Sequence, residues 1–222
     1  MAWSREAKEE PPMPRIGPFE EYSDEYDEWF ERNTDLYEAE LGAIRQLLPP
    51  PGASGMEVGV GSGKFAEPLG IKIGVEPSAR MAMRAREKGI EVCSGVAEEL
   101  PFPDSSFDFV LVVTTICFVD DVMKSLREVL RVLRADGFII VGFVDKASHL
   151  GRRYSERREQ SKFYKDATFH SATEVLEYLG MAGFEITAIR QTLVPEKPPG
   201  TILEGFGIGA FVVIKGRKNK DT

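Results

Sequence analysis

Three glycines at alternate positions, directly after a short apolar run, constrain the fold of this chain more than any other feature. The run 56–58 suits a buried strand, and a second apolar run, 71–75, ends in the acid Glu76. Residues 64–67 between them can open a helix. The glycines of the turn are Gly59, Gly61 and Gly63. Because glycine lacks a Cβ atom, such a turn lets a ligand approach the main chain closely. A strand, a glycine turn, a helix and a strand ending in a carboxylate form the first half of a nucleotide-binding crossover unit.

The spacing of the glycines narrows the choice of ligand. Dinucleotide-binding turns follow the pattern Gly-x-Gly-x-x-Gly, whereas the last position of that pattern is here occupied by Lys64. A phosphate-binding loop would need Ser or Thr after this lysine, and Phe65 stands there. The spacing therefore disfavours a dehydrogenase and a phosphate-binding loop, while an ordinary glycine-rich turn remains an alternative.

The composition is typical of one folded domain. The chain has 222 residues, of which 42% are hydrophobic, so it can bury a core. Its formal net charge of −8 argues against a general nucleic-acid binder, because such proteins carry a basic footprint. No apolar run has the length of a membrane helix, and the charged, proline-rich start is not a signal peptide. The only two cysteines lie in apolar runs, so we expect a reduced, cytoplasmic protein without a metal site.

Strand and helix patterns alternate after Glu76. Gly137 is expected to end a helix that begins near residue 121, and Ser171 with Glu174 forms a capping box before a later helix. The expected strands after the second apolar run are 90–94, 109–113, 138–143, 184–193 and 209–214. This alternation predicts an α/β fold with a parallel sheet and right-handed crossovers.

The segments outside this alternation divide the chain further. We expect residues 1–18 to be disordered, residues 19–216 to form a single domain, and residues 217–222 to form a tail. Residues 19–48 read as one helix with an aromatic stripe, and residues 146–170 form an insert. The stripe consists of Tyr22, Tyr26, Trp29 and Phe30. It either packs on the core or forms a lid over the ligand.

Two further motifs give the sequence a family resemblance. The loop 97–108, Ala-Glu-Glu-Leu-Pro-Phe-Pro-Asp-Ser-Ser-Phe-Asp, strongly resembles the type 11 branch of class I S-adenosylmethionine-dependent methyltransferases. So does the pattern from Leu130 through Leu133 to Gly137 and Phe138. With the glycine turn and Glu76, these motifs occur in family order over roughly residues 50–145. The resemblance implies a doubly wound, Rossmann-like sheet of seven strands, mostly parallel with the last strand antiparallel, and helices on both faces. It also implies S-adenosyl-L-methionine as the cofactor.

The resemblance implies cofactor contacts at matching positions. Glu76 would bind the ribose hydroxyls, and the N–H of Ala97 would bind the adenine ring. Family members often carry Asp at the position of Val96, so here Glu98 or a water molecule would replace it. We add Trp29 of the stripe as a lid residue. The full set of implied cofactor-binding residues is Glu57, Gly59, Val60, Gly61, Gly63, Glu76, Pro77, Ser78, Ala97, Glu98, Thr114, Thr115 and Trp29.

A catalytic base is harder to identify. Many relatives carry a His-His pair where this chain has Cys117 and Phe118. Methyl transfer from a sulfonium needs a base only if the acceptor must lose a proton. The candidates are His149, Tyr22 and Tyr26, and His170 reads better as a structural residue.

We expect methyl transfer to nitrogen, oxygen or carbon of a small-molecule acceptor, without a membrane or nucleic-acid partner. One alternative is methylation of RNA or protein through the basic segment 152–165, although Glu156 and Glu159 interrupt its positive charge. The other is a binding module for S-adenosylmethionine without catalysis. Both a monomer and a homodimer remain open.

Overall fold

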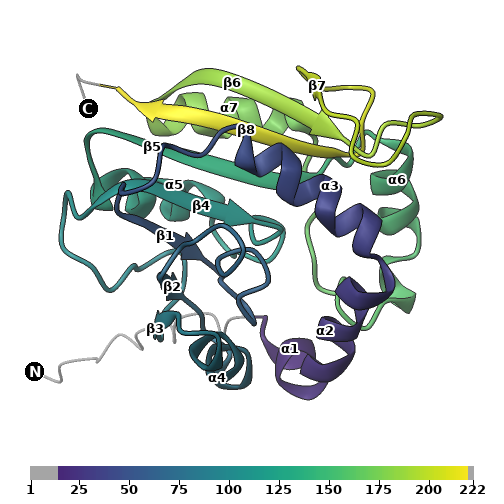
Figure 1. Ribbon diagram of the computed structural model, residues 1–222, viewed down its shortest axis with the longest axis horizontal. Coiled ribbons are helices and arrows are strands. Elements are labelled where there is room, and N and C mark those ends of the chain that lie inside the picture. Colours follow the sequence, from purple (N-terminus) through teal and green to yellow (C-terminus); the bar gives the residue numbers. More distant parts are fainter. Residues whose placement is uncertain (1–14, 220–222) are drawn as a thin grey trace, which may run out of the picture.

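Continuous apolar runs form the centre of a twisted sheet in this computed structural model, which describes residues 15–219. The parallel strands are β1 (Gly55–Val58), β2 (Ile73–Val75), β3 (Glu91–Cys93), β4 (Phe107–Val113) and β5 (Leu133–Val144). The strand order in the sheet is β3-β2-β1-β4-β5-β8-β6-β7 (Figure 1). Strand β4 and residues 138–144 of β5 carry almost unbroken apolar sequences because helices cover both of their faces.

The other edge of the sheet contains the antiparallel pairs. Strand β8 (Phe211–Lys218) lies antiparallel between β5 and β6 (Phe184–Thr192), as the family resemblance implies. The structure adds one strand to the expected seven, β7 (Leu203–Glu204), which pairs antiparallel with β6. Two residues are too few to show alternation, so the sequence predicts only a loop there. Strand β8 also extends to Lys218 and thereby takes in the first two residues of the expected tail.

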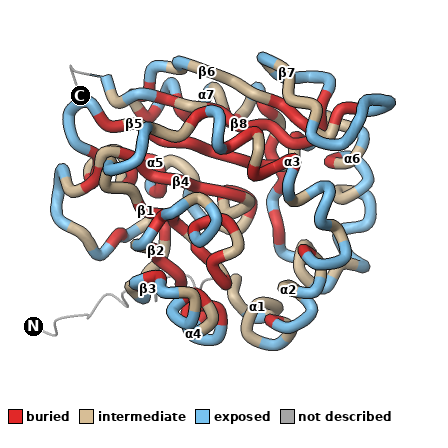
Figure 2. Tube along the Cα trace, viewed as in Figure 1, coloured by how far each residue is buried: buried red, intermediate tan, exposed pale blue. Residues whose placement is uncertain are grey.

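Two helical layers enclose the sheet. Helices α5 (Val122–Val132) and α7 (Ala172–Ala182) pack on one face, and α3 (Thr34–Arg45) and α4 (Ala79–Glu87) pack on the other. The predicted capping box of Ser171 and Glu174 starts α7, and Gly183 ends it with a φ of 99°. Figure 2 shows buried residues concentrated along the central strands. The prediction of an α/β sheet with helices on both faces is confirmed.

The segment expected to be one helix at 19–48 is divided into three. Helices α1 (Gly17–Glu21), α2 (Ser23–Arg32) and α3 are separated at Tyr22 and Asn33, whose backbone angles leave the helical region. The Asn33 Nδ2 donates to the carbonyl of Trp29 at 2.8 Å, which satisfies one of the last carbonyls of α2. These breaks let α1 and α2 turn away from the sheet face and cross the carboxyl ends of the strands (Figure 1).

Two other local predictions need correction. Residues 64–67 form turns instead of a helix, although Glu67 still donates to the carbonyl of Gly63 at 3.1 Å. Helix α5 ends at Val132, so Gly137 does not end it but lies within β5. A Cβ at Gly137 would lie 3.0 Å from the carbonyl oxygen of Arg134, so glycine permits a close backbone approach there.

The remaining helical pieces lie in the predicted insert. They are α6 (His149–Glu156) and the short 3-10 helix η1 (Arg158–Gln160). Residues 1–18 were expected to be disordered, and positions 1–14 lie outside the described residues. Arg15 and Ile16 are described and precede α1. Among the described residues, no helix is both long enough and apolar enough to cross a bilayer.

Candidate functional site

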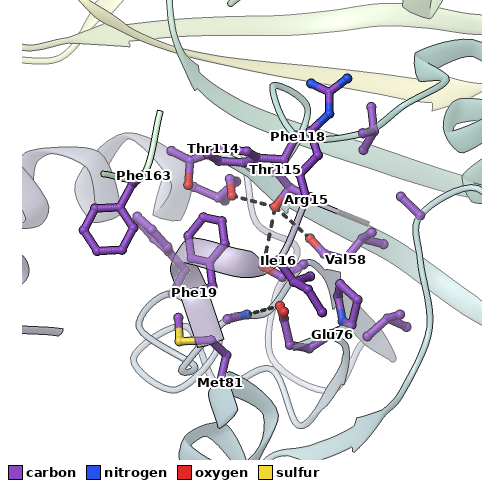
Figure 3. A pocket seen from close by; sticks show the side chains of 18 of the residues that line it. Arg15, Ile16, Phe19, Val58, Glu76, Met81, Thr114, Thr115, Phe118 and Phe163 are labelled. Atoms are coloured by element: carbon purple, nitrogen blue, oxygen red, sulfur yellow. Dashed lines mark hydrogen bonds between the residues drawn. The ribbon is translucent and has the colours of Figure 1, made fainter. Parts of the chain in front are cut away.

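A cavity of about 450 Å³ lies where β1, β2 and β4 end, beneath α1, α2 and α3 (Figure 3). Parallel strands present their carboxyl ends at one edge, which is the usual position of ligand sites in open α/β sheets. The volume lies in the range of small-molecule sites. One part of the wall consists of the glycine turn, Glu76 and the loop from Gly95 to Glu99, and the other part is aromatic.

The glycine turn exposes backbone to this cavity. All three glycines have positive φ, with 68° at Gly59, 54° at Gly61 and 80° at Gly63. A Cβ at Gly59 would lie 2.4 Å from Oγ1 of Thr115, and one at Gly63 would lie 2.6 Å from Cδ1 of Ile90. At Gly61 the nearest atoms to such a Cβ are 3.5 and 3.8 Å away, so this residue leaves space on the cavity side. The first and third glycines serve packing, and the second gives a ligand access to the main chain.

Glu76 is held from both sides of the crossover unit. Its Oε2 accepts from the N–H of Gly61 at 2.9 Å (Figure 3). Its Oε1 accepts from the N–H of Ser78, also at 2.9 Å. Burial raises the pKa of Glu76, and these two hydrogen bonds oppose that rise. A carboxylate can accept about four hydrogen bonds, so each oxygen retains a lone pair for a hydroxyl in the cavity.

The end of β4 contributes two threonines. Thr114 lines the cavity with a φ of 50°, an uncommon value for a β-branched residue, and its N–H donates to the carbonyl of Gly142 at 2.8 Å. Oγ1 of Thr115 lies 3.0 Å from the carbonyl oxygen of Val113 and 3.2 Å from that of Val58. This hydroxyl therefore connects the ends of the two central strands directly beneath the glycine turn.

The loop after β3 forms the far end of the cavity. Glu98 Oε1 accepts from the N–H groups of Asp120 and Asp121 at 2.7 and 3.2 Å, which attaches this loop to the start of α5. Glu98 is the residue expected to replace the Asp that relatives often carry at the position of Val96. One oxygen of its carboxylate therefore already has backbone partners. Arg15 closes this end: its Nε lies 3.2 Å from Asp120, and its Nη1 donates to the carbonyl of Asp166 at 2.5 Å.

Aromatic rings from three segments form the opposite wall. The Phe19 ring lies 5.1 Å from that of Phe118, and 5.8 Å from each of Tyr26 and Phe163, between ring centroids. Trp29, Tyr154 and Tyr164 extend this wall. Burial raises the pKa of Tyr26, so its phenol stays protonated near neutral pH. A protonated phenol can donate a hydrogen bond to a ligand, and the role of Tyr26 as a base stays a prediction.

A buried acid, Glu40 of α3, lines the cavity among these rings and was not predicted from the sequence. Only 5% of its surface is exposed, and burial raises the pKa of its carboxyl to about 8. In the sequence it follows Leu36 by four residues, so an acid stands on the apolar face of a helix. That mismatch between residue type and helical position is the signal that could have identified it.

Helix α2 is fastened to the glycine turn. Asp27 accepts from Oγ of Ser62 at 2.5 Å and from Nη1 of Arg84 at 2.8 Å, and Nζ of Lys64 lies 3.8 Å away. Lys162 also pairs with Glu25 at 2.8 Å. We call Asp27, Ser62, Arg84 and Lys64 the clasp. It holds α2 over the sheet edge and so keeps the cavity covered.

The structure places most of the predicted cofactor residues in the cavity wall. Those that line it are Gly59, Gly61, Glu76, Pro77, Ala97, Glu98, Thr114, Thr115 and Trp29, with Tyr26 from the catalytic candidates. The cofactor candidates that do not line it are Glu57, Val60, Gly63 and Ser78. Val60 packs in the core, and the Ser78 side chain accepts from the N–H of Met81 and caps α4.

Glu57 lies beneath the turn, with only 1% of its surface exposed. Its Oε2 has no hydrogen-bond partner in the part of the chain that the structure describes. Burial raises the pKa of this carboxyl well above its ordinary value.

The other catalytic candidates lie away from the cavity wall. His149 is exposed at the first position of α6. Tyr22, between α1 and α2, contacts Phe163 edge to face, and Nζ of Lys162 lies over its ring. His170 is buried, and its ring centroid lies 5.6 Å from that of Tyr178. Burial lowers the pKa of His170. None of these three side chains therefore lines the cavity.

Comparisons with known proteins agree on one family. A family profile described as a methyltransferase domain matches residues 56–141. An uncharacterised protein of Methanocaldococcus jannaschii is 42% identical over 203 residues, which cover 90% of this chain and 98% of that protein. A Thermotoga maritima crystal structure, described as a SAM-dependent methyltransferase and possible histamine N-methyltransferase, has a TM-score of 0.87 and 48% identity. The match covers 92% of this chain and all of that one.

A more distant structure supports the fold alone. A SAM-dependent methyltransferase from Aquifex aeolicus has a TM-score of 0.61 at 18% identity, over 82% of this chain and 90% of that one. The order of the motifs, the sheet topology and the close relatives agree with one another. The chain thus belongs to the class I S-adenosylmethionine-dependent methyltransferases, in their type 11 branch, and is an enzyme that uses S-adenosylmethionine.

Proposed function

We propose that this enzyme methylates a small molecule that binds inside the cavity, between the glycine turn and the aromatic wall. The observation that carries this proposal is that one covered space contains both a polar half and an aromatic half. S-adenosylmethionine supplies a methyl group on a positively charged sulfur, which is already an activated leaving group. The protein then has to position the acceptor and exclude water.

In this proposal the polar half holds the cofactor. Glu76 would accept hydrogen bonds from the two ribose hydroxyls, because each of its oxygens retains a lone pair in the cavity wall. Gly61 would lie against the methionine part, where the turn leaves room for it. Pro77 and Ala97 would border the adenine ring, and Trp29 would cover the site from α2. Ser78 would act indirectly, since its N–H orients the Glu76 carboxylate.

The aromatic half would hold the acceptor. Tyr26 would donate a hydrogen bond or present its ring, and α1 and α2 would keep water from the reacting atoms. The description of the Thermotoga maritima relative as a possible histamine N-methyltransferase is in keeping with a small acceptor. A macromolecular acceptor would have to displace the clasp to reach the cavity. The basic segment 152–165 contributes aromatic rings to the cavity wall, whereas its arginines are exposed and do not line the cavity.

Calorimetry on one substitution tests the cofactor half. Glu76→Ala should weaken binding of S-adenosylhomocysteine by about 10- to 100-fold, because hydrogen bonds to a charged group contribute roughly 1.5–3 kcal/mol. The control is Glu87→Ala, which removes an exposed acid of α4 and should leave the affinity unchanged. Equal affinities in both variants would remove Glu76 from the ribose site.

Transfer of radiolabelled methyl to small molecules tests the acceptor half. Labelling of RNA or protein alone would contradict a small-molecule acceptor and support the basic segment. Binding of S-adenosylhomocysteine without transfer to any acceptor would favour a binding module.

A further inference from the structure

We infer that the acceptor is an amine, and that Glu40 binds its ammonium group and accepts its proton. This inference rests on the proposed function and adds the chemical class of the acceptor. It also assigns a role to a residue outside the implied cofactor site.

The carboxylate of Glu40 lacks a partner within the protein. It is 95% buried, yet it lines the cavity, so its remaining access is to the ligand space. In the part of the chain that the structure describes, no hydrogen-bond donor or cation pairs with it. Burying a carboxyl group without a partner is costly, and natural proteins retain such groups mainly at functional sites. A ligand that brings a hydrogen-bond donor and positive charge would satisfy this group.

The surroundings of Glu40 favour a cation and disfavour an anion. Tyr26, Tyr154 and Tyr164 are the titratable groups that its charge affects, and burial raises the pKa of each phenol. Their ring faces, with that of Trp29, attract cations. Among the described residues, the cavity wall contains two positively charged side chains, Arg15 and Lys124. They belong to the end formed by the loop after β3, where Arg15 pairs with Asp120.

Glu40 belongs to the acceptor half of the cavity. It projects from the same face of α3 as Leu36, and the residues of α6 that line the cavity are Leu150 and Tyr154. Tyr26 lines the same cavity as the two acids, and the charges of Glu76 and Glu40 both raise its pKa. The Glu76 end is the proposed ribose site, so an acceptor can occupy the Glu40 end while the cofactor is bound.

The chemistry of N-methylation matches this group. An ammonium ion has no lone pair and must lose a proton before its nitrogen can attack. The proton moves to the Glu40 carboxylate, the nitrogen–carbon bond forms, and the carbon–sulfur bond breaks with its electron pair left on sulfur. The proton then passes to water. Burial raises the pKa of the Glu40 carboxyl to about 8 in the ligand-free site, and the positive charge of a bound ammonium ion would compensate the carboxylate that this site otherwise disfavours.

Paired ligands test the inference. Calorimetry would compare phenethylamine with 2-phenylethanol, and histamine with 4-(2-hydroxyethyl)imidazole, on wild type, Glu40→Gln and Glu38→Gln. Glu38 is an exposed acid of the same helix and serves as the matched control. The titrations would be made with and without S-adenosylhomocysteine, whose own affinity is measured on the same samples.

We expect wild type and Glu38→Gln to bind at least one amine about tenfold or more tighter than its alcohol, as one hydrogen bond to a charged group predicts. Glu40→Gln should lose that preference and keep its weak affinity for the alcohol. Repeating the titration in buffers of different ionisation enthalpy should show proton release on amine binding at pH 7 in wild type and Glu38→Gln, but not in Glu40→Gln. A merely structural carboxyl would not give this signal.

The outcomes separate the two proposals. If no amine is preferred over its alcohol, or if Glu40→Gln keeps the preference, the amine assignment is wrong even when S-adenosylhomocysteine binds normally. If S-adenosylhomocysteine fails to bind while the amine preference holds, the proposed cofactor site is wrong and the role of Glu40 in binding amines stands.

Discussion

Gly59 and Gly70 share a left-handed backbone but differ in their surroundings, which allows strain and clash to be measured separately. Their φ angles are 68° and 74°. A Cβ would lie 2.4 Å from Thr115 at Gly59, whereas no described atom beyond the immediate chain lies within 4 Å at Gly70. Each alanine substitution should cost about 1–2 kcal/mol for the left-handed backbone. Gly59→Ala should lose roughly 1–3 kcal/mol more through overpacking. Urea unfolding gives both values, and equal losses would show that Thr115 moves aside freely.

The raised pKa of Glu40 predicts how stability depends on pH. Burial moves the pKa from its ordinary value of 4.5 to about 8, so between these pH values the folded state retains a proton that the unfolded state has lost. The stability that this proton provides is complete below pH 4.5 and is lost as the pH rises through 8. Glu40→Gln cannot ionise, so its stability relative to wild type should rise across this window by up to about 1.4 kcal/mol per pH unit.

Thermal unfolding of ligand-free protein at pH 5, 7 and 9 checks this prediction, with Glu38→Gln as the control. A constant difference between Glu40→Gln and wild type would mean that the carboxyl is not buried as described. Tyr26, Tyr154 and Tyr164 do not interfere, because burial keeps these neighbouring phenols protonated over the same range.

Residue-level prediction from the sequence succeeded where spacing alone determines a position. The alternate glycines and the acid at the end of β2 identify Glu76 as a cavity residue, because backbone geometry at a strand end leaves few alternatives. Glu40 escaped notice because α3 and its neighbours contain many acids, and burial of one of them depends on how α6 packs across from it. His149 illustrates the opposite error, since sequence proximity to β5 says nothing about which way α6 turns.

At the scale of elements, the clasp determines how firmly α2 covers the cavity. Asp27→Asn removes the charge that holds Ser62, Arg84 and Lys64. Since hydrogen bonds to a charged group contribute roughly 1.5–3 kcal/mol, S-adenosylhomocysteine should dissociate about tenfold faster or more. Amide hydrogen exchange in residues 17–32 should increase, while exchange in β4 and β5 stays the same.

Asp35→Asn is the matched control for the clasp. Asp35 is exposed in the first turn of α3 and lies outside the clasp, so both measurements should equal those of wild type. If Asp27→Asn also behaves as wild type, α2 is held by its aromatic packing and the clasp is dispensable.

The strands were predictable because each buried parallel strand needs an apolar run bounded by turn residues. The course of the segment 19–48 was not predictable to the same degree. Its apolar spacing continues through Tyr22 and Asn33, so the pattern indicates one helix even though the backbone bends twice. The bends depend on contacts with distant elements, such as Glu20 with the N–H of Arg80.

For the whole molecule, binding of the cofactor product should stabilise the folded state. A ligand at 100 times its dissociation constant adds about 2.7 kcal/mol to the free energy of unfolding. For a chain of this size, that corresponds to a rise in melting temperature of about 5–10 °C. Scanning calorimetry with S-adenosylhomocysteine should show this rise in wild type and a smaller one in Glu76→Ala at the same concentration. An unchanged melting temperature in wild type would contradict the proposed cofactor site.

The cavity draws its two halves from different stretches of the chain, and this has a consequence for descent. The family profile spans residues 56–141, which include Glu76 and the glycine turn. Glu40 lies before that span, and Tyr154 and Tyr164 lie after it. If the flanking segments bind the acceptor as proposed, a lineage can exchange them, and with them its acceptor, while it inherits the proposed cofactor half unchanged. Two descendants with the same central motifs can in this way come to modify different molecules.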